Sequence, residues 1–125
     1  MPASHWIFVY GTLKRGLCRA HFLAGQHFWG EARTLPQYRM FDCGTYPGLK
    51  LASTGGLSIV GELWEVDEEC LARLDREEGL PEGLYAREKI ELTPPASSSR
   101  PHSLIEAYYY LPSVDGYPDC GECWG

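Results

Sequence analysis

Strand-like segments outnumber helical ones in this 125-residue chain, and this is the feature that most limits its fold. One helix is predicted from Asp67 to about Glu78. Asp67 is a good N-cap, and Gly79 followed by Pro81 is a stop signal. A second, short helix is predicted over residues 17–24. With so little helix, the chain must bury its apolar residues mainly between strands.

The strand-like segments alternate in polarity or are rich in β-branched and aromatic residues. They are His5–Leu13, Arg33–Asp42, Ser58–Asp67, Tyr85–Thr93 and Ser103–Leu111. The second of these is the weakest, because Pro36 restricts its first half to a sheet edge or a bulge. A segment rich in Pro and Ser, Thr93–Ser103, predicts a long hairpin loop. The pattern predicts an α+β fold, a small mixed or antiparallel β-barrel with one or two short helices.

Length and charge narrow the possible functions. The chain fits one domain, which we place at residues 1–112, followed by a C-terminal tail at 113–125. Its net charge is −6 and it has no Lys/Arg cluster, which argues against nucleic-acid and anionic-membrane partners. No apolar run approaches the roughly 20 residues of a membrane span, and no signal-peptide pattern is present. We therefore expect a cytoplasmic protein, and the sequence leaves its oligomeric state open.

The predicted helix separates two adjacent carboxylates. Leu71, Leu74 and Glu78 follow the i, i+3, i+7 spacing of one helix face, whereas Glu77 lies off that face, toward solvent. Burial and the negative end of the helix dipole should both raise the pKa of Glu78. A carboxyl group of that kind suits general acid/base catalysis.

An ordinary structural role for Glu78 is the alternative. The helix could fray after Asp75, leaving Glu78 in solvent or paired with Arg87. Because helix ends are difficult to place from sequence, the pattern alone leaves both interpretations open.

The segment FVYGTLKRG, residues 8–16, runs from a strand into a turn bounded by glycines. The G-x-x-x-x-G spacing matches a phosphate-binding loop, but the Lys and Ser/Thr that must follow are absent, so that interpretation fails. One remaining possibility is a strand end where Gly11 lets a ligand approach backbone N–H groups. The other is a plain turn. In both, Lys14 and Arg15 are expected to be solvated charges.

The cysteines offer a competing function. Their odd number, five, without a secretion signal argues for reduced thiols. Cys120 and Cys123 form a C-x-x-C pair in the tail, a spacing used by redox pairs and zinc sites. Zinc would need two more ligands, for which only Cys43 and His102 are loosely plausible. A thiol or zinc protein therefore stays as an alternative.

Five segments of the sequence resemble, in the expected order, the gamma-glutamylcyclotransferase-like family, including its gamma-glutamylamine cyclotransferase and butirosin-pathway members. They are FVYGTLKRG, YRMFDCGTYPGL, VGELWEVD, LDREEG followed by YARE, and EAYYYL, and they cover about residues 6–112. The tail has no clear counterpart. The resemblance implies a small mixed-sheet barrel and an enzyme that acts on a small γ-glutamyl substrate without metal, cofactor or protein nucleophile.

The resemblance also implies a set of site residues and a reaction. The glutamyl-binding loop would be Tyr10, Gly11, Thr12 and Leu13, and the acid/base carboxylate would be Glu78. Further pocket residues would be Tyr46, Pro47, Tyr85 and Tyr110. The substrate's α-amino group would attack its γ-carbonyl carbon, giving 5-oxoproline and a free amine. A non-catalytic protein that binds a ligand in the same pocket is a further alternative.

Overall fold

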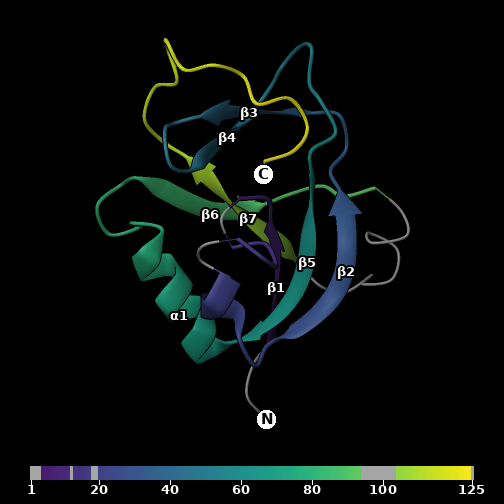
Figure 1. Ribbon diagram of the computed structural model, residues 1–125, viewed down its shortest axis with the longest axis vertical. Helices are drawn as coiled ribbons and strands as arrows, with labels where there is room; N and C mark the ends of the chain where they lie inside the picture. The colour runs from purple at the N-terminus through teal and green to yellow at the C-terminus, as the bar shows by residue number, and fades with distance from the viewer. Residues whose placement is uncertain (1–3, 12, 18–19, 94–103, 125) are drawn as a thin grey trace.

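The computed structural model describes residues 4–11, 13–17, 20–93 and 104–124 (Figure 1). Within them, the strands are β1 (Ser4–Val9), β2 (His27–Arg33), β3 (Tyr38–Asp42), β4 (Pro47–Leu51), β5 (Val60–Asp67), β6 (Tyr85–Lys89) and β7 (Ile105–Tyr110). The helices are the single 3-10 turn η1 (Ala20–Leu23) and α1 (Glu68–Glu77). Neither helix has the length and apolar character needed to cross a membrane.

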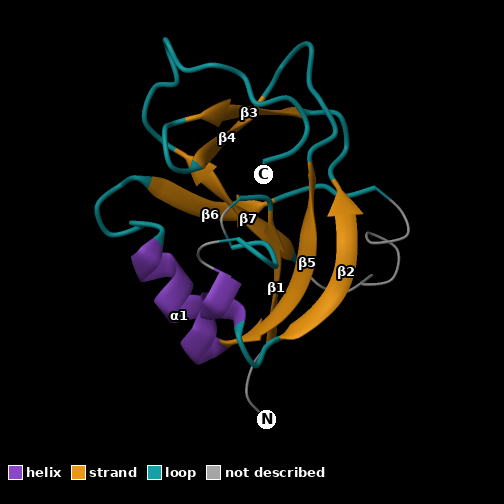
Figure 2. Cartoon of the chain, viewed as in Figure 1, coloured by secondary structure: helices purple, strands orange, loops and turns teal. Residues whose placement is uncertain are grey.

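Five strands form one curled sheet in the order β2-β5-β1-β7-β6, and β3 and β4 form a separate hairpin (Figure 2). β1 is antiparallel to β5 but parallel to β7, so the sheet is mixed. Just beyond the two edge strands, the Leu35 N–H donates to the Glu91 carbonyl at 3.0 Å. The predicted small mixed-sheet α+β fold is confirmed. The sheet is curled and joined at one end, and is not a barrel closed along its whole length.

The core is divided by the sheet into two apolar clusters. Because side chains alternate along a strand, β1 sends Ile7 and Val9 toward α1, and Phe8 toward the other face. The first cluster continues through the buried face of α1. The second is covered by the β3–β4 hairpin, whose Met40 and Leu49 are fully buried. β1 therefore lies at the centre of the molecule.

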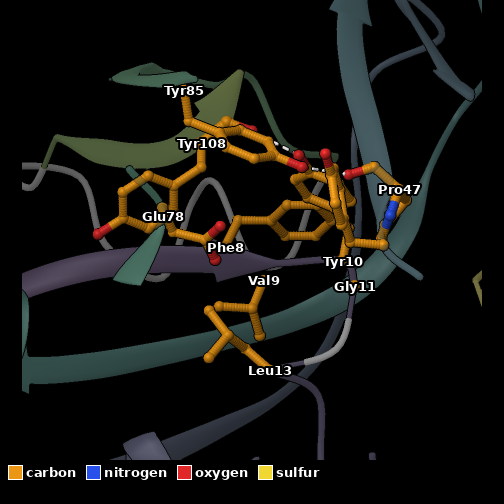
Figure 3. A pocket seen from close by; sticks show the side chains of 10 residues that line it. Phe8, Val9, Tyr10, Gly11, Leu13, Pro47, Glu78, Tyr85 and Tyr108 are labelled. Carbon is orange, nitrogen blue, oxygen red and sulfur yellow. Dashed lines mark hydrogen bonds between the residues drawn. The ribbon is translucent and has the colours of Figure 1, made fainter. Parts of the chain in front are cut away.

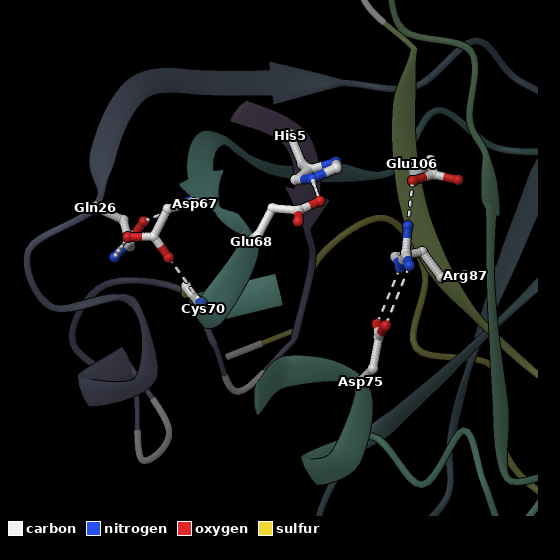
Figure 4. Close-up of polar contacts among 8 residues, drawn as sticks. All are labelled: His5, Gln26, Asp67, Glu68, Cys70, Asp75, Arg87 and Glu106. Carbon is white, nitrogen blue, oxygen red and sulfur yellow. Dashed lines mark hydrogen bonds and ion pairs between the residues drawn. The ribbon is translucent and has the colours of Figure 1, made fainter. Parts of the chain in front are cut away.

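Helix α1 begins and ends as its sequence predicts. The Cys70 N–H donates to the Asp67 carboxylate at 2.7 Å, which forms the N-cap (Figure 4). At the other end, the Glu78 N–H still donates to the Leu74 carbonyl at 2.9 Å, and Gly79 then turns the chain with φ +72°. The helix does not fray after Asp75, so that alternative is wrong.

Two strands escaped prediction. β2 contains Gly30 at φ +126°, beside a register shift between Phe28 and Gly30, and this bulge interrupts its alternation. β4 begins with Pro47 and Gly48, which usually mark a turn. Only the second half of the predicted strand Arg33–Asp42 forms β3. Most of the predicted Thr93–Ser103 loop lies outside the described residues.

The C-terminal tail is packed against the domain. The Asp42 N–H donates to the Pro118 carbonyl, and the Val60 N–H donates to the Glu122 carbonyl, both at 2.8 Å. Trp124 then packs against the cluster beneath the hairpin. The tail thus connects the hairpin to β5. The boundary that we place at residue 112 stays a prediction.

Candidate active site

A pocket lies at the end of β1, where the C-terminal end of α1, the start of β4 and strands β6 and β7 meet (Figure 3). Its described lining residues are Phe8, Val9, Tyr10, Gly11, Leu13, Tyr46, Pro47, Glu78, Tyr85 and Tyr108. Seven of the residues predicted from the sequence are among them. Thr12 lies outside the described residues, and Tyr110 lies behind the lining.

Among the described residues that line the pocket, Glu78 is the one with a carboxyl group. It is 9% exposed, whereas the neighbouring Glu77 is exposed to solvent. Figure 3 shows its carboxyl group turned toward the pocket, near the rings of Phe8 and Tyr108. The helical spacing predicted that Glu78 lies on the buried face and Glu77 on the exposed face, and this difference is confirmed.

Arg87, the alternative partner considered for Glu78, is engaged elsewhere. Its Nε and Nη2 atoms donate to the two carboxylate oxygens of Asp75 at 2.9 and 3.1 Å, and its Nη1 donates to Glu106 at 2.5 Å (Figure 4). The Tyr108 hydroxyl donates to the same Asp75 carboxylate at 2.8 Å. This Asp75 network ties the helix to β6 and β7, one turn before Glu78.

The loop after β1 packs closely against the start of β4. A Cβ atom added to Gly11 would lie 2.7 Å from Cγ of Pro47, closer than real Cβ contacts come. A glycine is therefore required at this position by its neighbour. The Lys14 N–H then donates to the Gly11 carbonyl at 3.1 Å, which forms a turn at the rim of the pocket.

Tyrosine hydroxyl groups join the segments that surround the pocket. Tyr85 donates to the Pro47 carbonyl at 2.6 Å, and Tyr10 donates to the Tyr108 carbonyl at 2.5 Å. Burial raises the pKa of both the Tyr10 and the Tyr85 phenol, and the nearby Glu78 carboxylate adds to each shift. Both phenols consequently stay protonated at neutral pH and act as hydrogen-bond donors.

Tyr110 supports the pocket from behind. Its ring centroid lies 5.4 Å from that of Tyr85 and 6.2 Å from that of Tyr46, in edge or tilted geometry. Tyr108 also lines the pocket but was not predicted from the sequence. The available signal was strand alternation, because Tyr108 and Tyr110 are two residues apart and so lie on the same face of β7.

The cysteine pair lies outside this pocket. Cys120 is half-buried, and burial together with Asp42 and Asp119 raises the pKa of its thiol to about 11. That shift disfavours the thiolate that redox and metal chemistry require. Among the described residues, no three His, Cys, Asp or Glu side chains are grouped to hold a metal, and His102 lies outside them. The geometry therefore lends no support to the thiol or zinc alternative.

Known proteins are similar to this chain in both sequence and fold. The sequence model of the family described as "Gamma-glutamyl cyclotransferase, AIG2-like" matches residues 7–124. The match includes the tail, so the statement that the tail has no clear family counterpart is wrong. A protein of Vibrio cholerae serotype O1 with a provisional gamma-glutamylcyclotransferase name is 39% identical over 83% of this chain and 93% of its own.

Solved structures of related proteins have a similar fold. The solution structure of YtfP from Escherichia coli has a TM-score of 0.69 and 28% identity, and the alignment covers 95% of this chain and 94% of YtfP. The crystal structure of an AIG2-like protein from Mus musculus has a TM-score of 0.67 and 27% identity. Its alignment covers 89% of this chain and 78% of the mouse protein.

Proposed function

The chain belongs to the AIG2-like gamma-glutamyl cyclotransferase family, and we propose that it releases 5-oxoproline and a free amine from a γ-glutamyl amine or γ-glutamyl amino acid. The observation that carries the proposal is the buried Glu78 carboxyl group in an aromatic pocket, opposite the loop at Gly11. The expected cytoplasmic location and the lack of a cofactor belong to the same proposal.

The proposed reaction needs two proton transfers. The substrate's α-amino nitrogen bonds to its γ-carbonyl carbon and closes a five-membered ring, while the bond from that carbon to the leaving nitrogen breaks. Glu78 accepts one proton from the α-ammonium group and gives it to the leaving nitrogen. The attacking nitrogen must lose a second proton to become the ring amide, and the same carboxylate passes this proton to the released amine, which departs as an ammonium ion. General acid/base catalysis of this type contributes roughly 10²–10⁴-fold to the rate.

The surroundings of Glu78 support this role. Glu78 is buried in the wall of the pocket, where its carboxyl group can reach a bound substrate. The phenols of Tyr10 and Tyr85 stay protonated because their pKa values are raised, which leaves the carboxyl group as the base of the pocket. Backbone N–H groups at the Gly11 turn would hold the carbonyl oxygen as negative charge develops there.

An assay for 5-oxoproline tests the proposal. The protein is incubated with a panel of γ-glutamyl amino acids and γ-glutamylamines, and release of both products is measured by mass spectrometry. We expect equal amounts of 5-oxoproline and amine from at least one substrate. The matched N-acetylated substrate should give none, because its nitrogen is no longer a nucleophile. Binding of the panel without any product would favour the non-catalytic alternative.

Gly11→Ala should lower the activity without unfolding the protein. The added Cβ would push the loop away from Pro47, so we expect kcat/KM to fall at least about 10-fold, with roughly 1–3 kcal/mol of stability lost to overpacking. Gly16→Ala is the control in the same loop. It meets no atom within 4 Å, and its φ of +82° costs about 1–2 kcal/mol of backbone strain. Equal activity in the two variants would contradict the assignment of the Gly11 turn to the pocket.

A further inference from the structure

Glu62 is a buried carboxylate that does not line the pocket. It is 6% exposed and lies on β5, directly opposite Val9 of β1. A buried carboxylate is costly unless hydrogen bonds or charges compensate it. The hydrogen-bond donors around Glu62 therefore indicate its role.

Those partners lie on the loop that leaves the pocket. The Arg15 backbone N–H donates to Oε1 of Glu62 at 3.0 Å, and the Arg15 Nε donates to Oε2 at 3.4 Å. The indole N–H of Trp64 also donates to Oε1, at 3.1 Å. The Arg15 guanidinium lies 3.8 Å above the centroid of the Phe28 ring. The same carboxylate thus binds both the backbone and the side chain of Arg15.

The charge pair alone does not explain a buried carboxylate at this position. The Arg15 side chain is 56% exposed, and exposed ion pairs contribute little to stability. The hydrogen bond from the backbone N–H is the contact that fixes the chain, because it restrains the loop itself. Arg15 follows Leu13, a lining residue of the pocket, by only two positions.

The neighbouring Lys14 is held as well. Its Nζ atom donates to the Trp124 carbonyl of the tail at 2.5 Å. The Arg15 side chain is exposed, as expected of a solvated charge, although it also contacts Glu62. Lys14 is only partly exposed, and its contact with the tail was not expected. The downstream side of the loop is anchored at two successive residues, by β5 and by the tail.

We propose that Glu62 is a positioning residue that holds the γ-glutamyl-binding loop in its productive conformation. This inference rests on the proposed function. Glu62 acts through Arg15 and does not touch the substrate. The proposed function places this loop against the glutamyl half of the substrate. Loss of the anchor should therefore weaken the binding of every γ-glutamyl substrate by the same factor, whatever its leaving amine.

Kinetics of matched variants test the inference. Glu62→Met removes the acceptor and the charge while keeping an unbranched side chain of similar length. We expect kcat/KM to fall roughly 10–100-fold, mainly through a higher KM, and by the same factor for every substrate of the panel. Glu62→Gln should stay within about threefold of wild type, because its amide oxygen still accepts the Arg15 N–H. Glu65→Met is the control on the same strand, since Glu65 accepts the indole N–H of Trp29, away from the pocket.

Amide hydrogen exchange tests the anchor without using activity. The Arg15 amide should be protected in wild type and in Glu62→Gln, and should exchange at least about 10-fold faster in Glu62→Met. An Arg15 amide unprotected in wild type, or equally protected in Glu62→Met, would overturn the inference even if Glu62→Met were poorly folded or inactive. Faster exchange with an unchanged KM would overturn it too. Absence of turnover in wild type would instead count against the proposed function, and the exchange result would still decide the anchor.

Discussion

Replacing Glu78 by Gln is expected to lower kcat/KM for 5-oxoproline release by roughly 10²–10⁴-fold and to leave the fold intact. Gln has nearly the shape of Glu but cannot accept and return a proton at neutral pH. Burial of an amide is less costly than burial of a carboxylate, so the free energy of unfolding should be unchanged or slightly higher. Steady-state kinetics on the best substrate, together with urea unfolding, measure both effects.

The adjacent Glu77 provides a matched control. Glu77→Gln makes the same chemical change one residue earlier, on the exposed side of the helix, and should leave kcat/KM within about twofold of wild type. Wild-type turnover in Glu78→Gln would refute the acid/base role. Equal losses in both variants would show that the net charge of the helix end matters, and not a proton transfer in the pocket.

Replacing Asp75 by Ala is expected to have the largest effect on stability, a loss of roughly 2–4 kcal/mol. Asp75 accepts two hydrogen bonds from Arg87 (Figure 4). It accepts a third from the Tyr108 hydroxyl. The Asp75 side chain is 24% exposed and that of Arg87 is 23% exposed, so solvent replaces these contacts only in part. Asp75 raises the pKa of Arg87, but arginine is protonated at neutral pH even without such a partner. In Asp75→Ala the Arg87 guanidinium would therefore stay charged, and of its two carboxylate partners Glu106 would remain. Urea unfolding measures the loss.

A second carboxylate on the same helix provides the comparison. Glu68 pairs with His5 at 3.0 Å, but its side chain is 70% exposed, so Glu68→Ala should cost at most about 1 kcal/mol. A double-mutant cycle of Asp75→Ala and Arg87→Ala should give a coupling energy above about 1 kcal/mol. Additive effects in that cycle would show that the Asp75 network does not stabilise the helix against the sheet.

Local patterns predicted the part of the site that depends on local geometry. Glu78 was found because helical spacing places it on the face of Leu71 and Leu74, and both leucines are buried. Gly11 was found as a close-approach position at a strand end. Its partner Pro47 was named only through a family-like segment, since nothing local connects the two residues.

The anchors of the loop after β1 were missed because they depend on distant partners. Arg15 binds Glu62, which is 47 residues away, and Lys14 binds Trp124, which is 110 residues away. Periodicity within a segment carries no information about such pairs. Strand β4 was missed for a similar reason. Its Gly48 is needed because a Cβ there would lie 2.8 Å from the Tyr110 ring, but in the sequence it resembles a turn residue.

The parallel pairing of β1 with β7 has a consequence for how the protein is made. Trp6 pairs with Ile105, and the Tyr10 hydroxyl binds the Tyr108 carbonyl across 98 residues. Contacts of such high contact order form slowly, because a long loop must close first. During translation, β1 cannot complete its pairing until β7 has left the ribosome, so the pocket is completed only after residue 110 has been synthesised.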